Sequence, residues 1–90
     1  MSVVWARVAL DDVERIYDYI VAFNPRAAAE FADRLFEAGN SLEKFPERGR
    51  PIGRGRREYL VIWPYVIRYR LADGNVEIMR VHHGRQRAPR

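Results

Sequence analysis

The residues of this 90-residue chain best suited to chemistry are its arginines and histidines, and most of them lie in the second half. Residues 48–90 contain 11 Arg and 3 Asp or Glu, a net charge of +8, whereas residues 1–47 contain 5 Lys or Arg and 9 Asp or Glu, a net charge of −4; together they give +4. A guanidinium is a flat, forked donor that suits phosphates and carboxylates. We therefore expect the second half to attract an anionic partner, although a well-solvated basic surface would have the same composition.

His82 and His83 are the only histidines. A pair of imidazoles is well suited to proton transfer near neutral pH. Adjacent residues of a strand point to opposite faces, however, so we do not expect these two to act together. The chain has no cysteine and no third ligand near the histidines, so the sequence predicts neither a disulfide nor a metal site. It also indicates no cofactor.

The overall composition is that of a folded chain. Hydrophobic residues make up 48% of it, and 2 Trp, 5 Tyr and 4 Phe argue against disorder. The first ten residues do not resemble a signal peptide, and no apolar run is long enough to span a membrane. We expect one complete cytoplasmic domain over residues 1–90.

The first half predicts a short strand followed by two helices. Residues 2–8 are rich in β-branched and aromatic types, as strands are. A helix follows, either from a capping box at Asp11 and Glu14 or from a start nearer Val8; its apolar stripe is Val13, Ile16, Tyr17 and Ile20.

A second helix is predicted over residues 25–44. Asn24 is a good N-cap, and Pro25 suits the first helical position. Because the link between the helices is short, we expect an antiparallel helical hairpin.

The second half predicts a loop and three strands. Residues 45–57 hold three Gly, two Pro and five Arg, which is typical of a loop. The strands are predicted over residues 57–62, 65–71 and 76–82, and Asp73-Gly74 is a strong hairpin signal between the last two. The fold class is therefore α+β: an N-terminal strand, an antiparallel helical hairpin and a three-stranded antiparallel meander, in the order β-α-α-β-β-β.

The hairpin can be placed in register around Asp73-Gly74, with Tyr69 opposite Ile78 and Arg70 opposite Glu77. Alternation then predicts a core face and an open face. The core face would carry Tyr65, Ile67, Tyr69, Leu71, Val76, Ile78 and, by the same alternation, Arg80. The open face would carry Val66, Arg68, Arg70, Glu77, Met79 and Val81, a mixture of apolar and basic groups that suits a docking surface.

The order of these elements and several local patterns resemble the ParE/RelE superfamily of bacterial toxins. The first pattern lies in the first helix and consists of Ala9, Asp12-Val13, Ile16 and Tyr19-Ile20. The other five are Phe45-Pro46, Gly49-Arg50-Pro51, Arg57-Glu58-Tyr59-Leu60, Tyr65-Val66-Ile67-Arg68-Tyr69-Arg70-Leu71 and Val76-Glu77-Ile78-Met79-Arg80-Val81-His82-His83-Gly84-Arg85-Gln86. No single pattern is specific, but six in this order cover nearly the whole chain. The resemblance implies the toxin of a type II toxin–antitoxin pair. RelE-like members cut messenger RNA on the ribosome, whereas ParE-like members poison DNA gyrase and have no known hydrolytic centre.

Two departures from the RelE-like pattern favour the gyrase branch. Val66 stands where RelE-like toxins have an arginine, and the C-terminal segment has no tyrosine to act as an acid. In the favoured interpretation the chain therefore has no catalytic residues. The alternative is a ribosome-dependent endoribonuclease, and its candidate catalytic residues are Arg68, Arg70, Arg80 and His83. A third hypothesis is a degenerate toxin kept only as a binding partner.

The resemblance also indicates binding surfaces. Candidate target-binding residues are Arg57, Arg80, His83 and Arg85, although Arg80 could instead be a structural residue paired with a helix acid. The expected antitoxin is an acidic segment that folds on binding along the helical hairpin and across the sheet. Its candidate contacts are Val13, Ile16, Ile20, Val66, Arg68, Met79 and Val81. Direct nucleic-acid binding is not expected, since the basic half lacks an ordered platform of exposed aromatic side chains.

Overall fold

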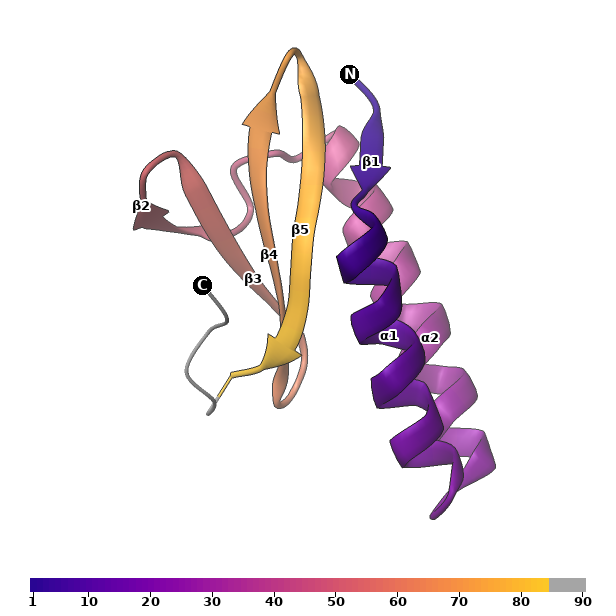
Figure 1. Cartoon of the computed structure of the whole chain (residues 1–90). Coiled ribbons are helices and arrows are strands. Elements are labelled where there is room, and N and C mark those ends of the chain that lie inside the picture. Colours follow the sequence, from indigo (N-terminus) through magenta and orange to yellow (C-terminus); the bar gives the residue numbers. More distant parts are fainter. Residues whose placement is uncertain (85–90) are drawn as a thin grey trace.

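A sheet packed against a pair of helices makes up the computed structural model of the chain, which describes residues 1–84 (Figure 1). In chain order the elements are β1 (Val3–Trp5), α1 (Arg7–Val21), α2 (Pro25–Asn40), a 3-10 turn (Ser41–Glu43), β2 (Arg50–Gly53), β3 (Arg56–Ile62), β4 (Tyr65–Ala72) and β5 (Asn75–His83). The strands lie in the order β1-β5-β4-β3-β2, with β1 parallel to β5 and the remaining pairs antiparallel. The predicted α+β class and the predicted element order are confirmed.

Strand β2 was not predicted, because its sequence is typical of a loop. Arg50 pairs with Glu58 and Pro51 with Arg57, which places β2 at the edge of the sheet. An edge strand tolerates proline, since its outward N–H needs no partner strand. The turn to β3 contains Gly53, Arg54 and Gly55 at φ values of 92°, 55° and 73°, a left-handed stretch that explains the two glycines.

The helices begin and end somewhat differently from the prediction. Helix α1 begins at Arg7, with Ala6 as its N-cap and no side-chain cap, so the predicted capping box at Asp11 and Glu14 is wrong and the alternative start nearer Val8 is close. At α2 the prediction is confirmed, because Asn24 accepts a hydrogen bond from the backbone N–H of Ala27 at 3.1 Å. This helix ends at Asn40 rather than Lys44 and tightens into the 3-10 turn.

The hairpin of β4 and β5 keeps the predicted register only as far as Ile78. Tyr69 pairs with Ile78, but the next pair is Arg68 with Arg80, which leaves Met79 as an extra residue in a β-bulge. Beyond the bulge every side chain of β5 changes face. Val81 therefore joins the core at 0% exposure, and Arg80 shares a face with Arg68. The predicted faces of Val81 and Arg80 are wrong for this reason.

The core lies between the sheet and the helices. Its members include Ala9, Val13, Ile16, Phe31, Leu35, Leu42, Ile67, Tyr69, Val76, Ile78 and Val81. Leu71, expected there, is 49% exposed near the end of the hairpin. The buried Tyr69 hydroxyl donates to the carbonyl of Pro46 at 2.7 Å and accepts from the N–H of Gly49 at 2.9 Å, which fixes the loop before β2. Within residues 1–84, neither helix has the length and apolarity to cross a membrane.

Candidate functional site

Helix α1 and strand β5 are joined by a buried carboxylate. Strand β1 pairs with β5 only as far as Ile78. Beyond that residue, the side chain of Asp12 in α1 accepts the backbone hydrogen bond of β5 instead. Its Oδ2 accepts from the backbone N–H of Val81 at 2.9 Å and from Arg80 Nε at 2.8 Å, and its Oδ1 accepts from Arg80 Nη2 at 3.0 Å. Burial alone would raise the pKa of Asp12, but the hydrogen bonds from Arg80, Val81 and Arg15 outweigh it and lower that pKa below 3.8.

A second carboxylate is surrounded by two arginines and a histidine on the face of the sheet turned away from the helices. Glu58 of β3 accepts from Arg50 at 3.1 Å, and it lies 3.5 Å from Arg68 Nη2 and 3.2 Å from His82 Nε2. The side chains of Glu58, Arg68 and His82 are 13%, 9% and 7% exposed. The three strands β3, β4 and β5 each contribute one of these groups, so their mutual position is set by the sheet register. We call Glu58, Arg68 and His82 the Glu58 cluster.

Both ring nitrogens of His82 face acceptor oxygens. Nε2 faces Glu58 and Nδ1 lies 3.2 Å from the carbonyl oxygen of His83. Only the imidazolium donates from both nitrogens, whereas a neutral ring leaves one contact without a proton. The arrangement pairs a carboxylate, an imidazole and a guanidinium, which is a set able to move protons and bind phosphate.

His83 lies on the opposite face, as alternation predicted. Its ring packs edge to face against Tyr65, with centroids 5.7 Å apart, and Tyr65 packs in the same manner on Phe31. Burial raises the pKa of the Tyr65 phenol, and the nearby Tyr19 raises it further. The structure therefore separates His83 from the Glu58 cluster, and the two predicted catalytic candidates Arg68 and His83 do not meet.

The other predicted target-binding residues are mostly engaged within the fold. Arg57 donates to the carbonyl oxygens of Gly49 at 2.7 Å and Glu47 at 3.3 Å, so it holds the loop before β2. Arg80 is paired with Asp12, which is the structural role considered as its alternative. Arg70, a candidate catalytic residue of the ribonuclease alternative, is engaged as well, because it pairs with Glu77 at 2.8 Å across the hairpin. Arg85 lies outside the described residues.

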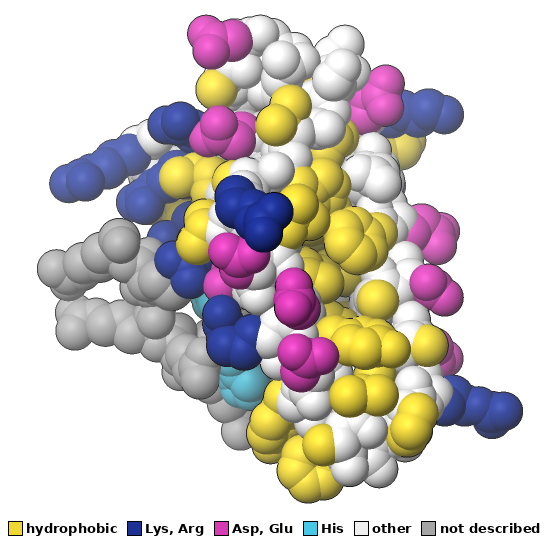
Figure 2. Space-filling model, turned by 45° about the vertical axis from the view of Figure 1, so that its right-hand side comes forward, with side chains coloured by type: hydrophobic (Ala, Val, Ile, Leu, Met, Phe, Trp, Pro, Cys, Tyr) yellow, Lys and Arg dark blue, Asp and Glu magenta, His cyan; other side chains and the backbone are white. Residues whose placement is uncertain are grey.

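The predicted antitoxin contacts divide into buried and accessible positions. Val13, Ile16 and Val81 are 6%, 9% and 0% exposed and belong to the core, so the fold does not present them to a partner. Val66 and Arg68 are also buried, although on the far face of the sheet. Only Ile20 and Met79 are partly exposed. Acidic and hydrophobic side chains share the helical side of the molecule (Figure 2).

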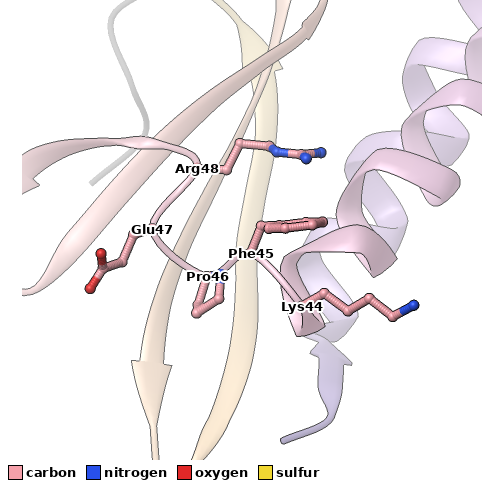
Figure 3. A pocket seen from close by; sticks show the side chains of 5 residues that line it. All are labelled: Lys44, Phe45, Pro46, Glu47 and Arg48. Atoms are coloured by element: carbon pink, nitrogen blue, oxygen red, sulfur yellow. The ribbon is translucent and has the colours of Figure 1, made fainter.

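A surface hollow lies beside the segment that follows the 3-10 turn. Lys44, Phe45, Pro46, Glu47 and Arg48 line it (Figure 3). The guanidinium of Arg48 lies 4.6 Å from the centre of the Phe45 ring and 5.7 Å from that of Tyr59. These cation–π contacts tie the end of the helical layer to β3.

Sequence reasoning missed Asp12, Glu58 and the pairing of His82 with Glu58. A signal existed for Asp12, since it lies three residues after Ala9 and four before Ile16, on the buried stripe of α1. No such signal existed for Glu58, because its neighbours depend on the registers of β3 and β5, and both contain irregularities. Within residues 1–84 no three His, Cys, Asp or Glu side chains gather as a metal site requires.

Comparison with known proteins identifies the class of molecule that this sheet and helical hairpin define. Residues 3–88 match the family described as the ParE toxin of the type II toxin–antitoxin system parDE. The chain belongs to this family, which confirms the resemblance seen in the sequence. It is 51% identical over 82 residues to Toxin RelE2 of Caulobacter vibrioides, covering 91% of this chain and 93% of that protein. Toxin RelE1 of the same organism is 40% identical over 76 residues, covering 81% of this chain and 82% of that protein.

Two solved structures share the fold. The chromosomal ParDE toxin–antitoxin system of P. aeruginosa superposes with a TM-score of 0.83 at 27% identity, covering 92% of this chain and 95% of that chain. The toxin–antitoxin complex RelBE2 of Mycobacterium tuberculosis superposes with a TM-score of 0.61 at 25% identity, covering 91% and 95%. The chain is thus a type II toxin, and a cognate antitoxin is its partner.

Proposed function

We propose that this toxin acts in the cytoplasm by inhibiting DNA gyrase, and that its antitoxin prevents this by binding it. The observation that carries the proposal is that the basic groups a ribonuclease would use are already paired with carboxylates inside the fold. Arg80 is held by Asp12, and Arg68 and His82 both face Glu58. Phosphate binding during RNA cleavage needs cations directed at the substrate.

Two further findings support the gyrase proposal. Val66, opposite His82 on the same face, offers neither charge nor proton where RelE-like toxins have an arginine. The TM-score is also higher for the ParDE structure than for RelBE2, 0.83 against 0.61. Fold similarity is an argument by analogy, so the proposal depends mainly on the residues.

The test is a supercoiling assay with purified gyrase, relaxed plasmid, ATP and increasing amounts of the toxin. We expect supercoiling to stop at a toxin excess and to recover when antitoxin is added first. His82→Gln should inhibit as the parent does, because the proposal gives His82 no catalytic part. Undiminished supercoiling at high toxin excess would refute the gyrase proposal.

The Glu58 cluster favours one second function, ribosome-dependent cleavage of messenger RNA. In that reaction Glu58 would take the proton of a 2′-hydroxyl, the oxygen would attack the neighbouring phosphorus, and the 5′-oxygen would leave with a proton from His82. Arg68 would offset the charge on the phosphate. Primer extension after induction distinguishes the two functions: cuts that disappear in His82→Gln but persist in Arg26→Gln, a change at an exposed arginine of α2, would establish cleavage.

A further inference from the structure

One arginine of the sheet has a buried donor that no acceptor among residues 1–84 satisfies. This donor is Nε of Arg56, which begins β3. A buried N–H without an acceptor is costly, so an oxygen atom that arrives from outside the chain would be favoured there. Neither the proposed inhibition of gyrase nor the alternative cleavage of messenger RNA uses this residue.

Arg56 lines a groove between the first turn of α1 and strands β3, β4 and β5. The volume of the groove is about 330 Å³, and its other walls include Ala6, Val8, Arg68, Met79 and Arg80. Small-molecule sites measure roughly 300 to 1,000 Å³, so this groove lies at the lower end of their range. It therefore admits a ligand of modest size.

The charges around the groove leave one positive charge over. The sheet register places four arginines on one face, and three of them are paired with carboxylates, as Arg70–Glu77, Arg68–Glu58 and Arg80–Asp12. Four guanidinium groups and three carboxylates give a net charge of +1, and Arg56 is the arginine without such a pair among residues 1–84. A guanidinium suits a phosphate or a carboxylate, so the groove matches one such group and not a series of them.

The groove extends across the strands. Arg56 belongs to β3 and Met79 to β5, with β4 between them, and Val8 lies on α1, which packs beside β5. Neighbouring strands are about 4.8 Å apart, so β3 and β5 are separated by roughly 10 Å. A lone carboxylate or inorganic phosphate at Arg56 would leave the far end of this groove empty.

The end of the groove opposite Arg56 is apolar. Val8 is 42% exposed, and Met79 is half-buried. A methionine thioether makes favourable contacts with aromatic rings, so a flat heteroaromatic ring suits this end. A phosphate at one end and a flat ring at the other, joined by a short polar body, are the features of a nucleotide.

We propose that this groove binds a nucleoside monophosphate. A phosphate oxygen accepts from Arg56 Nε, and the base packs against Val8 and Met79. Arg80 also donates to the ligand, because Asp12 accepts from only two of the five N–H donors of Arg80.

The single excess charge selects this ligand over more highly charged ones. Glu77 also lines the groove and would repel the further phosphates of a triphosphate. A nucleic-acid strand is bound through cations at several successive phosphates, which this groove does not offer. The inference is independent of whether the toxin acts on gyrase or on the ribosome.

The test is an NMR titration of the isotope-labelled, full-length toxin with adenosine monophosphate as the probe. We expect amide shifts that saturate and that centre on Val8, Arg56 and Met79. Inorganic phosphate should bind more weakly, since it lacks the ring, and adenosine should not bind measurably, since it lacks the phosphate. Adenosine triphosphate should bind no more tightly than the monophosphate.

A change of Arg56 tests the phosphate contact. Arg56→Gln should weaken binding of the monophosphate about 10- to 100-fold, because it removes a charged hydrogen-bonding partner. Arg54→Gln is the matched control: it removes the same charge from an exposed arginine of the preceding turn, outside the groove, and should bind as the parent does. Urea unfolding confirms that both variants are folded.

A change of Val8 tests the contact with the base. Val8→Ser should weaken binding of adenosine monophosphate about 3- to 10-fold, because less apolar surface is buried. The same change should leave the affinity for inorganic phosphate as it is in the parent. Leu10→Ser, at a 38% exposed position outside the groove, is its control.

Saturable binding that is weakened by Arg56→Gln and not by Arg54→Gln supports the site, whatever the supercoiling assay shows. Equal losses in these two variants would indicate a general attraction to basic surface and overturn the proposal, as would a titration without saturable shifts. A single-stranded oligonucleotide that binds more tightly than the monophosphate overturns it too, since the groove would then serve a nucleic-acid strand.

Discussion

At the scale of single residues, Asp12 links the first helix to the C-terminal strand. It is fully buried and joins α1 to β5 through one backbone N–H and one guanidinium. A buried carboxylate that accepts four hydrogen bonds, from Val81, Arg80 and Arg15, is costly to remove, because the donors that remain lose their acceptor. The residue therefore links the element that begins the helical hairpin to the strand that carries His82.

Asp12→Ala should lower the free energy of unfolding by about 3 kcal/mol, because the Val81 N–H and the Arg80 guanidinium lose their partner. Urea unfolding followed by circular dichroism measures this. Asp11→Ala is the control: Asp11 pairs with Arg7 at 3.4 Å on the exposed side of the same helix, and its loss should cost less than about 0.5 kcal/mol. Equal costs for the two variants would contradict a structural role for the buried carboxylate.

The same carboxylate predicts a pH dependence of stability. Burial works against the charged form of Asp12, but hydrogen bonds from Arg80, Val81 and Arg15 hold its native pKa below the 3.8 of an ordinary aspartate. The carboxylate therefore binds its proton less readily in the folded chain, so its stabilising contribution is fully present above pH 3.8. It is lost as the pH falls through the native pKa.

We expect the free energy of unfolding to fall more steeply below pH 3.8 in the parent than in Asp12→Asn, which has no charge to lose at this position. Urea unfolding at a series of pH values measures the two slopes. A variant that follows the parent curve in parallel would assign the acid sensitivity to other carboxylates.

At the scale of elements, helix starts and tight turns could be predicted, because each is determined by a few neighbouring residues. Asn24 and Pro25 mark the start of α2 through capping alone, and Asp73-Gly74 fixes the register of its hairpin as far as Ile78. The bulge at Met79 could not be predicted, because nothing local distinguishes the sequence around it from a regular strand. That one extra residue moved Val81 into the core and brought Arg80 to the face of Arg68. The candidate site consequently depended on tertiary register, and the Glu58 cluster was not foreseen.

The contact between α2 and the sheet is close enough to require a glycine. A Cβ on Gly39 would collide with the ring of Trp5 and lie 3.0 Å from Ile78 Cδ1. We expect Gly39→Ala to destabilise the chain by about 1 to 3 kcal/mol through overpacking, although alanine is the better helix former by about 1 kcal/mol. Thermal unfolding of Gly39→Ala and of the double variant with Trp5→Leu measures this. Removal of the ring should reduce the added cost of the alanine, and an undiminished cost would show that the Trp5 contact is not its cause.

At the scale of the whole molecule, charge is divided between the two halves of the chain. The helical half has a net charge of −4 and the half that forms most of the sheet has +8. Such a division favours contact between an acidic partner and the sheet. Composition alone predicts this attraction, whereas the positions of the individual arginines depend on how the strands are paired.

A chain of this size buries a limited core, so antitoxin binding should contribute visibly to its stability. Binding to the folded state alone stabilises it by about 2.7 kcal/mol when the free antitoxin is at 100 times its Kd. For a domain of this length, that corresponds to a rise in Tm of about 10 to 20 °C. Differential scanning fluorimetry of the toxin at several antitoxin concentrations measures the shift, which should grow with the logarithm of the concentration. A Tm that does not respond to antitoxin would mean that the unfolded chain binds it equally well.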